Sequence, residues 1–234
     1  MGILGIIPAR GGSKGVKDKN IMEIAGRPLI AYTIDAVLES QRLDKVVVST
    51  DSPKIAAVVR ELSSIDVIMR PPELARDDSP IEESFFHAVE YLREEEGFDT
   101  EILVWTQPNV PIRKPGVVDE ALGKLLESDA DSCVTCYETD QVPEVMKRID
   151  SQGFLVPLYR DISAIRRQEF ERRYLLDGSV VVLRTANLYS TRGIRKAHVY
   201  LGEKTVPLVQ EKMQYSLEID VPDDVDLVRY FLER

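Results

Sequence analysis

The sequence predicts an α/β domain with a mostly parallel sheet and covering helices. Strand-like and helix-like segments alternate along most of the chain, which is typical of parallel sheets with helical crossovers. The first strand-like run leads directly into a glycine-rich, cationic loop, at the position where open α/β sheets bind ligands. With 234 residues, 44% hydrophobic and 30% charged, the chain suits a single domain spanning residues 1–234.

The elements of the first half follow from hydrophobic patterning. Apolar, β-branched runs predict strands at residues 3–8, 45–50, 66–69 and 102–106. Apolar stripes at helical spacing predict helices at residues 28–40, 53–62 and 80–96. For the last of these, Ser79 is the expected N-cap, because Pro80 and then Glu82 and Glu83 match a first-turn proline and an acidic first turn.

In the second half, a helix is predicted at residues 115–127 and a strand at 132–137. The alternation then breaks over residues 140–177, a segment of short apolar pieces and a charge-rich run, which we interpret as an insertion. Strands at residues 179–183 and 216–219 and a helix at 222–232 complete the prediction.

Composition narrows the possible partners and location. The formal net charge of -10 argues against nucleic acid and anionic membranes as partners. The sequence has neither a transmembrane-length apolar segment nor a typical signal-peptide core, so we expect a cytoplasmic protein. Cys133 and Cys136 have C-x-x-C spacing, but they lie in a strand-like run far from both histidines. We therefore interpret them as two thiols in a strand, and not as a zinc or redox site.

The loop after the first strand is a candidate anion site. Its glycines Gly11, Gly12 and Gly15 allow successive backbone N–H groups to converge on an anion. Its cations are Arg10, Lys14, Lys17 and Lys19. Neither a Walker loop nor a dinucleotide fingerprint matches this spacing. We expect it to bind a nucleoside triphosphate; the alternative is a solvated turn with incidental lysines.

Polar residues follow two further predicted strands. Asp51 ends the strand at 45–50, where it either faces a ligand or caps the next helix. The loop 107–113 offers the donors Gln107, Asn109 and Arg113 to a carboxylate or hydroxyls, or forms a rigid turn with solvated tips.

Two charged pairs near the end of the chain are also candidates. Arg166 and Arg167, followed by Gln168, either clamp an anion or belong to a solvated helix face. In the predicted strand at 216–219 and just after it, Glu218 and Asp220 are two residues apart and project together. Paired carboxylates suit Mg²⁺ bound to substrate phosphates; the alternative is a pair of surface acids.

These motifs occur in a recognisable order over nearly the whole chain. Arg-x-Gly-Ser-Lys-Gly-x-x-x-Lys-Asn starts at Arg10, and Arg-Pro-Pro-Glu-Leu-Ala starts at Arg70. Gln-Pro-x-x-Pro-x-Arg starts at Gln107, Arg-Arg-Gln starts at Arg166, and Glu-Ile-Asp starts at Glu218. In this the sequence resembles the acylneuraminate cytidylyltransferase family, the CMP-sialic acid synthetases and their relatives acting on other 2-keto sugar acids.

The resemblance implies a nucleotide-diphospho-sugar transferase fold, a homodimer, and a dimerisation arm at residues 140–177. It implies that the amino-terminal loop holds CTP, with Arg70 near the base. The implied nucleotide-binding set is Arg10, Gly11, Gly12, Ser13, Lys14, Lys19, Asn20 and Arg70. The implied substrate-binding set is Gln107, Asn109, Arg113, Arg167 and Gln168, with Arg167 reaching the neighbouring subunit's site. Glu218 and Asp220 are implied as ligands of Mg²⁺, and Arg10, Lys14, Lys19 and Asp220 as catalytic residues.

The chain departs from the family pattern at three points. Asn109 and Val110 stand where sialic-acid enzymes usually have Thr-Ser, at positions that line the sugar pocket in the family. Glu218 replaces a customary aspartate, and Asp177 precedes Gly178 where Asn-Gly is common. We expect the first and third changes to alter the choice of sugar.

Together these features predict transfer of CMP from CTP to the anomeric hydroxyl of a sialic-acid-like 2-keto sugar acid, with release of pyrophosphate. Two alternatives stay open. One is a catalytically silent nucleotide-binding relative that has lost the sugar pocket, which the change at Asn109 and Val110 would permit. The other is a dinucleotide-dependent oxidoreductase, against which the missing G-x-G-x-x-G speaks.

Overall fold

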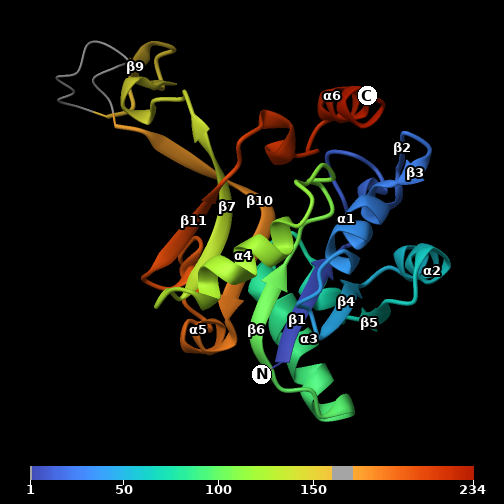
Figure 1. Cartoon of the computed structure of the whole chain (residues 1–234). Coiled ribbons are helices and arrows are strands. Elements are labelled where there is room, and N and C mark those ends of the chain that lie inside the picture. Colours follow the sequence, from blue (N-terminus) through green and yellow to red (C-terminus); the bar gives the residue numbers. More distant parts are fainter. Residues whose placement is uncertain (1, 160–170) are drawn as a thin grey trace.

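The computed structural model describes residues 2–159 and 171–234. Within these ranges a seven-stranded sheet forms the centre of the molecule (Figure 1). In spatial order its strands are β11 (Thr205–Val209), β7 (Ser132–Thr139), β10 (Arg173–Arg184), β6 (Thr100–Trp105), β1 (Gly2–Pro8), β4 (Lys45–Thr50) and β5 (Asp66–Met69). All neighbouring strands are parallel except β10, which runs antiparallel to both β6 and β7. The predicted α/β class with a mostly parallel sheet is confirmed.

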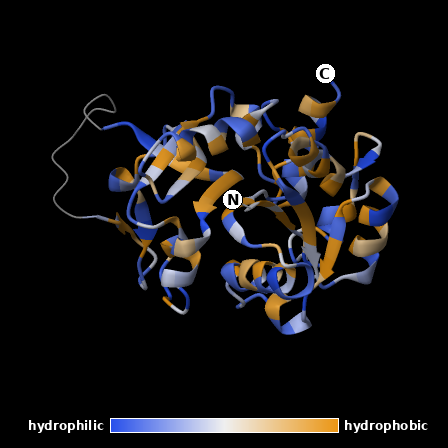
Figure 2. Cartoon of the chain, turned by 60° about the horizontal axis from the view of Figure 1, so that its bottom comes forward, coloured by the Kyte–Doolittle hydropathy of each residue, from blue (hydrophilic) through white to orange (hydrophobic). Residues whose placement is uncertain are grey.

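Helices cover both faces of the sheet. They are α1 (Leu29–Leu38), α2 (Pro53–Leu62), α3 (Ile81–Glu96), α4 (Val117–Leu126), α5 (Thr185–Ser190) and α6 (Pro222–Leu232). One face packs against α3 and α5 around Phe85, Phe86 and Trp105. The other face packs against α4 and, further along, against α1 and α2. Figure 2 shows hydrophobic strands in the interior and hydrophilic residues mainly on the outer helices and loops.

Shorter elements connect the layers. The two-residue strands β2 (Glu23–Ile24) and β3 (Arg27–Pro28) form a small ribbon before α1. Single 3-10 turns occur at η1 (Lys19–Ile21), η2 (Pro72–Ala75), η3 (Pro143–Val145), η5 (Val199–Leu201) and η6 (Met213–Ser216).

The predicted insertion projects from the sheet. Strands β7 and β10 continue outward as a pair and lead to the hairpin β8 (Lys147–Ile149) and β9 (Leu155–Pro157), seen at the upper left of Figure 1. Where β7 and β10 leave the body, the pairing is interrupted: Leu176 faces Cys136 and Val181 faces Val134, so residues 177–180 stand opposite Thr135 alone. Such a bulge bends a strand and turns its side chains to new directions.

Two predicted features are wrong. Residues 216–219 do not form a strand, because Ser216 ends η6 and the segment after it bonds to the loop of Asn109 and not to a strand. Ser79 does not cap α3: its hydroxyl donates to the carbonyl of Glu73 at 2.7 Å, and Pro80 occupies the N-cap position. The Ser79 hydroxyl is directed toward η2 by the connection between η2 and α3, and this direction depends on contacts outside the helix.

Candidate active site

A cavity of about 430 Å³ opens at the carboxyl end of β1 and β6, and we call it the first cavity. Most of the predicted nucleotide residues line it together with residues of two other loops. Its polar lining consists of Arg10, Ser13, Lys14, Lys19, Asn20, Arg70, Gln107, Asn109 and Asp220, and Gly15 and Trp105 also contribute. Chain segments far apart in sequence therefore meet where ligands bind in open α/β sheets.

Side chains and close backbone contacts fix the glycine-rich loop. The Asn20 amide donates to the carbonyl of Arg10 at 3.0 Å, and Asn20 is itself buried. Gly15 packs so tightly that a Cβ there would lie 2.1 Å from the carbonyl oxygen of Asp220. Gly15 is therefore required for the loop to approach the segment that carries Glu218 and Asp220.

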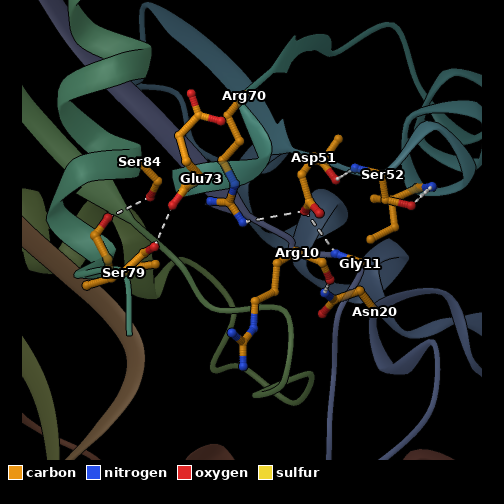
Figure 3. Close-up of polar contacts among 12 residues, drawn as sticks. Arg10, Gly11, Asn20, Asp51, Ser52, Arg70, Glu73, Ser79 and Ser84 are labelled. Carbon is orange, nitrogen blue, oxygen red and sulfur yellow. Dashed lines mark hydrogen bonds and ion pairs between the residues drawn. The ribbon is translucent and has the colours of Figure 1, made fainter. Parts of the chain in front are cut away.

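Asp51 supports the loop from the end of β4. The Gly11 backbone N–H donates to its carboxylate at 3.0 Å, and the Arg70 guanidinium lies 4.0 Å from the same oxygen (Figure 3). Helix α2 is capped instead by Ser52, whose hydroxyl accepts from Ile55 N–H. Asp51 is thus not the helix cap; it holds the glycine-rich loop through Gly11 and lies beside Arg70, which lines the first cavity.

Arg70 is the most buried cation of the site, with 3% of its side chain exposed. Burial lowers its pKa, while the charge of Asp51 raises it. Its Nε is buried without a hydrogen-bond partner within the described part of the chain. A buried donor without a partner is costly, so a ligand that accepts from this guanidinium would gain free energy.

Two cations of the loop share one carboxylate. Arg10 and Lys14 lie 3.0 and 2.6 Å from the two oxygens of Asp77, in the connection between η2 and α3. The pKa of Asp77 lies below its usual value, mainly because Lys14 bonds to its carboxylate and to a lesser extent because Arg10 does. An anion entering the cavity has to compete with this carboxylate for both cations.

The segment after η6 brings Asp220 to the first cavity and Glu218 to a second cavity beside it. Glu218 accepts from the Asn109 amide at 2.7 Å, and Ile219 N–H donates to the Asn109 carbonyl at 2.8 Å. Although Glu218 is open to solvent on one side, partial desolvation and then the Asp220 charge raise its pKa above the usual value, and the Asn109 bond lowers it. The negative charge of Asp220 thus disfavours ionisation of Glu218, and a bound cation would offset this effect.

A second cavity, of about 210 Å³, adjoins the first. Trp105 and Gln107 line both cavities and so form the wall between them. The other lining residues are Val134, Leu176, Asp177, Gly178, Val181, His198, Tyr200, Leu201 and Glu218. Gly178 has a φ of +64°, and a Cβ there would lie 2.5 Å from the Gln107 amide nitrogen. The bulge in β10 therefore places glycine where Gln107 needs the space.

Arg113 and Val110 do not have the positions that the sequence suggested. The Arg113 guanidinium donates to the carbonyls of Gln107 and Ser179 and to the Thr33 hydroxyl, and it lines neither cavity. Assigning Arg113 to substrate binding is therefore wrong; it holds the 107–113 loop in place. The Val110 side chain is fully buried, so it does not line a sugar pocket, although Asn109 does line the first cavity.

The remaining predicted residues are placed as follows. Arg166, Arg167 and Gln168 lie outside the described residues. Cys133 and Cys136 are buried in β7, and burial raises the pKa of Cys133 to about 11, so this thiol stays protonated at neutral pH. Across residues 2–159 and 171–234, no three acidic, cysteine or histidine side chains gather into a metal site of their own. In the same ranges, none of the helices combines the length and apolar character needed to span a bilayer.

Sequence reasoning missed Asp77 and Trp105. Trp105 is the only tryptophan of the chain and ends β6 directly before the Gln107 loop, a position that marks it as a candidate. Asp77 has no such signal, because its pairing with Arg10 and Lys14 depends on how η2 and α3 fold over the glycine-rich loop.

Comparisons with known proteins agree with this geometry. A family model described as cytidylyltransferase matches residues 4–233. The chain is 31% identical over 235 residues to a CMP-N,N'-diacetyllegionaminic acid synthase of Legionella pneumophila, covering 100% of this chain and 97% of that one. It is 30% identical over 221 residues to an N-acylneuraminate cytidylyltransferase of Streptococcus agalactiae, covering 94% of this chain. The match covers 50% of that streptococcal relative, so the chain spans about half of its length.

Solved structures share the fold. A CMP:2-keto-3-deoxy-manno-octonic acid synthetase complexed with CTP superposes with a TM-score of 0.72 at 19% identity, covering 100% of this chain and 99% of that one. A 4-diphosphocytidyl-2C-methyl-D-erythritol synthase from Anaerococcus prevotii superposes with a TM-score of 0.67 at 14% identity, with 100% and 99% coverage. At these identities the likeness is one of fold.

Proposed function

This chain belongs to the cytidylyltransferase family, and from that premise we propose that it transfers CMP from CTP to a sialic-acid-like 2-keto sugar acid. The observation that carries the proposal is the pair of cavities separated by Trp105 and Gln107. The first has the cations and the glycine-rich loop for a triphosphate, and the second has space for a small polar ligand beside Glu218. The names of the relatives, which specify legionaminic and neuraminic acids, support this substrate class.

In the proposed reaction the anomeric hydroxyl of the sugar acid attacks the α-phosphorus of CTP. A new phosphorus–oxygen bond forms, the bond to the β-phosphate oxygen breaks, pyrophosphate leaves, and the proton of the hydroxyl passes to solvent. Arg10, Lys14 and Lys19 would hold the leaving pyrophosphate, because all three line the first cavity. Gln107, in the wall between the cavities, would orient the sugar acid for attack. Catalysis then consists mainly of positioning and charge stabilisation.

Glu218 and Asp220 fit a magnesium ion. Mg²⁺ is usually held by one or two carboxylates together with substrate phosphates, and here Asp220 lines the first cavity while Glu218 lines the adjoining second one. When bound, the ion would supply positive charge at the reacting phosphate. Asn109 orients the Glu218 carboxylate for this role by donating to one of its oxygens.

We further propose a homodimer that uses the projecting arm. The β8–β9 hairpin exposes Ile149, Phe154 and Leu155 to 70%, 65% and 72%. Apolar surface of this extent on one projecting element is typical of an interaction site. Arg167 and Gln168, which belong to the same insertion, are our candidates for contacts with the partner's sugar acid.

Pyrophosphate release from CTP, measured against a panel of 2-keto sugar acids, tests the proposal. Turnover with at least one acid is expected. A protein that binds CTP but releases no pyrophosphate with any acid would instead be the silent nucleotide-binding relative. The buried position of Val110 removes one reason for that alternative, because the change from serine takes no hydroxyl out of either cavity. Family membership leaves the oxidoreductase alternative without support.

A further inference from the structure

His198 lies in the wall of the second cavity and has no role in the proposed chemistry so far. It directly precedes η5, in a loop that joins α5 to β11. Trp105 and Gln107 border both cavities, whereas His198 borders only the second. A group of the sugar acid that reaches His198 therefore lies outside the first cavity, which would hold the triphosphate.

The two carboxylates that line the second cavity already have partners, whereas the Trp105 Nε1–H, which also lines it, has none within the described residues. Both oxygens of Asp177 accept hydrogen bonds, from Thr135 and the Ser179 N–H on one side and from Ser216 on the other. Glu218 accepts from Asn109. The His198 ring, by contrast, has no hydrogen bond or ion pair with any other residue that the structure describes, so its N–H is available to a ligand.

The backbone and the neighbouring rings hold His198 in place. Its φ is +56°, one of three left-handed non-glycine positions in the described chain. Such a backbone conformation is unfavourable for a non-glycine residue and persists where the surroundings impose it. The ring stands edge to face with Tyr200, with centroids 6.2 Å apart, and Tyr200 in turn contacts Trp105 at 5.9 Å. An unbroken row of rings therefore connects His198 to the wall between the cavities.

The His198 side chain is exposed, and the second cavity beside it has an apolar wall. Val134, Val181 and Leu201 line the same cavity, and Tyr200 contributes its ring. A hydroxyl alone would leave this surface without a partner, whereas an acylamido group presents both a carbonyl oxygen for an imidazole N–H and a methyl group for the apolar wall.

We propose that His198 is a specificity-determining residue that donates a hydrogen bond to an acylamido substituent of the sugar acid. The inference rests on the proposed function. It assigns the second cavity to acids in which a remote hydroxyl is replaced by an acylamido group, and it assigns His198 to the recognition of that replacement.

The test compares pairs of acids that differ at one carbon. N-acetylneuraminate is paired with its counterpart that has a hydroxyl in place of the acetamido group, and a diacetamido acid is paired in the same way. His198→Gly removes the ring where glycine tolerates the left-handed backbone, and His198→Phe keeps an aromatic ring but removes the N–H. Lys196→Ala, two residues away and outside the second cavity, is the matched control. Thermal unfolding checks that each variant is folded.

For the wild type we expect a higher kcat/KM with the acylamido member of a pair. Both His198 variants should lose about tenfold or more of kcat/KM for that member and about twofold or less for the hydroxyl member. Lys196→Ala should leave the ratio unchanged. Equal losses for both members, no loss for either, or a wild type that prefers the hydroxyl member would overturn the proposal. A folded wild type that releases no pyrophosphate from CTP with any acid would overturn the proposed function itself.

Discussion

Lys19 and Asp220 form an ion pair across the candidate site, with Nζ 3.0 Å from the carboxylate oxygen. The same ammonium donates to the Ile219 carbonyl at 2.7 Å, and 15% of the Lys19 side chain is exposed. The glycine-rich loop and the segment of Glu218 and Asp220 are therefore joined by one cation. A ligand that binds the loop changes the surroundings of both acids at once.

Replacing Lys19 tests the phosphate assignment. Lys19→Ala should weaken CTP binding by about 1.5–3 kcal/mol, because one charge-assisted contact to phosphate is lost. Lys17→Ala is the control, since Lys17 belongs to the same loop but does not line the first cavity. Calorimetric titration of CTP measures both. Unchanged CTP affinity in Lys19→Ala would disprove the assignment of the loop.

Asp220→Asn tests the assignment of the metal. The amide is nearly isosteric but lacks the charge that a hard divalent cation favours. We expect CTP still to bind through Arg10 and Lys14, and kcat to fall by about 100-fold or more, because charge stabilisation at the phosphate is worth several kcal/mol. Titrations with magnesium should show a weaker dependence. A variant with near-normal kcat and unchanged magnesium dependence would mean that Asp220 is a surface acid.

Asp77 competes with the triphosphate for Arg10 and Lys14. Asp77→Asn should therefore bind CTP more tightly than the wild type, and the gain should shrink as salt screens the charges. The neighbouring acid supplies the control, because Asp78→Asn makes the same change in formal charge without breaking these two contacts. Dissociation constants at two ionic strengths decide the matter. If both variants bind CTP more tightly by the same factor, the gain comes from the net charge alone and the prediction that Asp77 competes with the triphosphate is wrong.

Val110 gives a prediction about stability. Val110→Ser should destabilise the protein by about 1–3 kcal/mol, because the hydroxyl would enter a fully buried position. It should leave the preference among sugar acids unchanged. Val110→Ala separates lost packing from the buried hydroxyl. Denaturant unfolding measures the stability, and the pyrophosphate assay measures the preference among sugar acids. An altered preference with unchanged stability would mean that Val110 does line the sugar pocket.

The sequence predicted elements best where local signals and packing agree. Helix α2 begins and ends as expected, because Ser52 caps it and Pro53 fits its first turn. Strand β11 was missed, since Pro207 lies in its middle; proline is tolerated there because β11 is an edge strand. The alternation around Glu218 suggested a strand, yet the Ile219 N–H bonds to the Asn109 loop and not to a ladder.

Site residues could be selected from the sequence, but the directions of their side chains could not. Arg113 was chosen for its donors, and those donors are used by three protein oxygens. Asn109 and Val110 are adjacent, yet one borders the first cavity and the other is buried. Such differences arise from the turn of a single loop, which depends on tertiary contacts that a single sequence does not specify.

The bulge at residues 177–180 has a mechanical consequence. The strands that wall the second cavity, β7 and β10, are the same two that extend outward to the β8–β9 hairpin. A protein that binds the hairpin therefore contacts the arm to which β7 and β10 lead, and the inner part of β10 carries Asp177 and Gly178. A change in the twist of these two paired strands would reach the place where Gly178 meets Gln107.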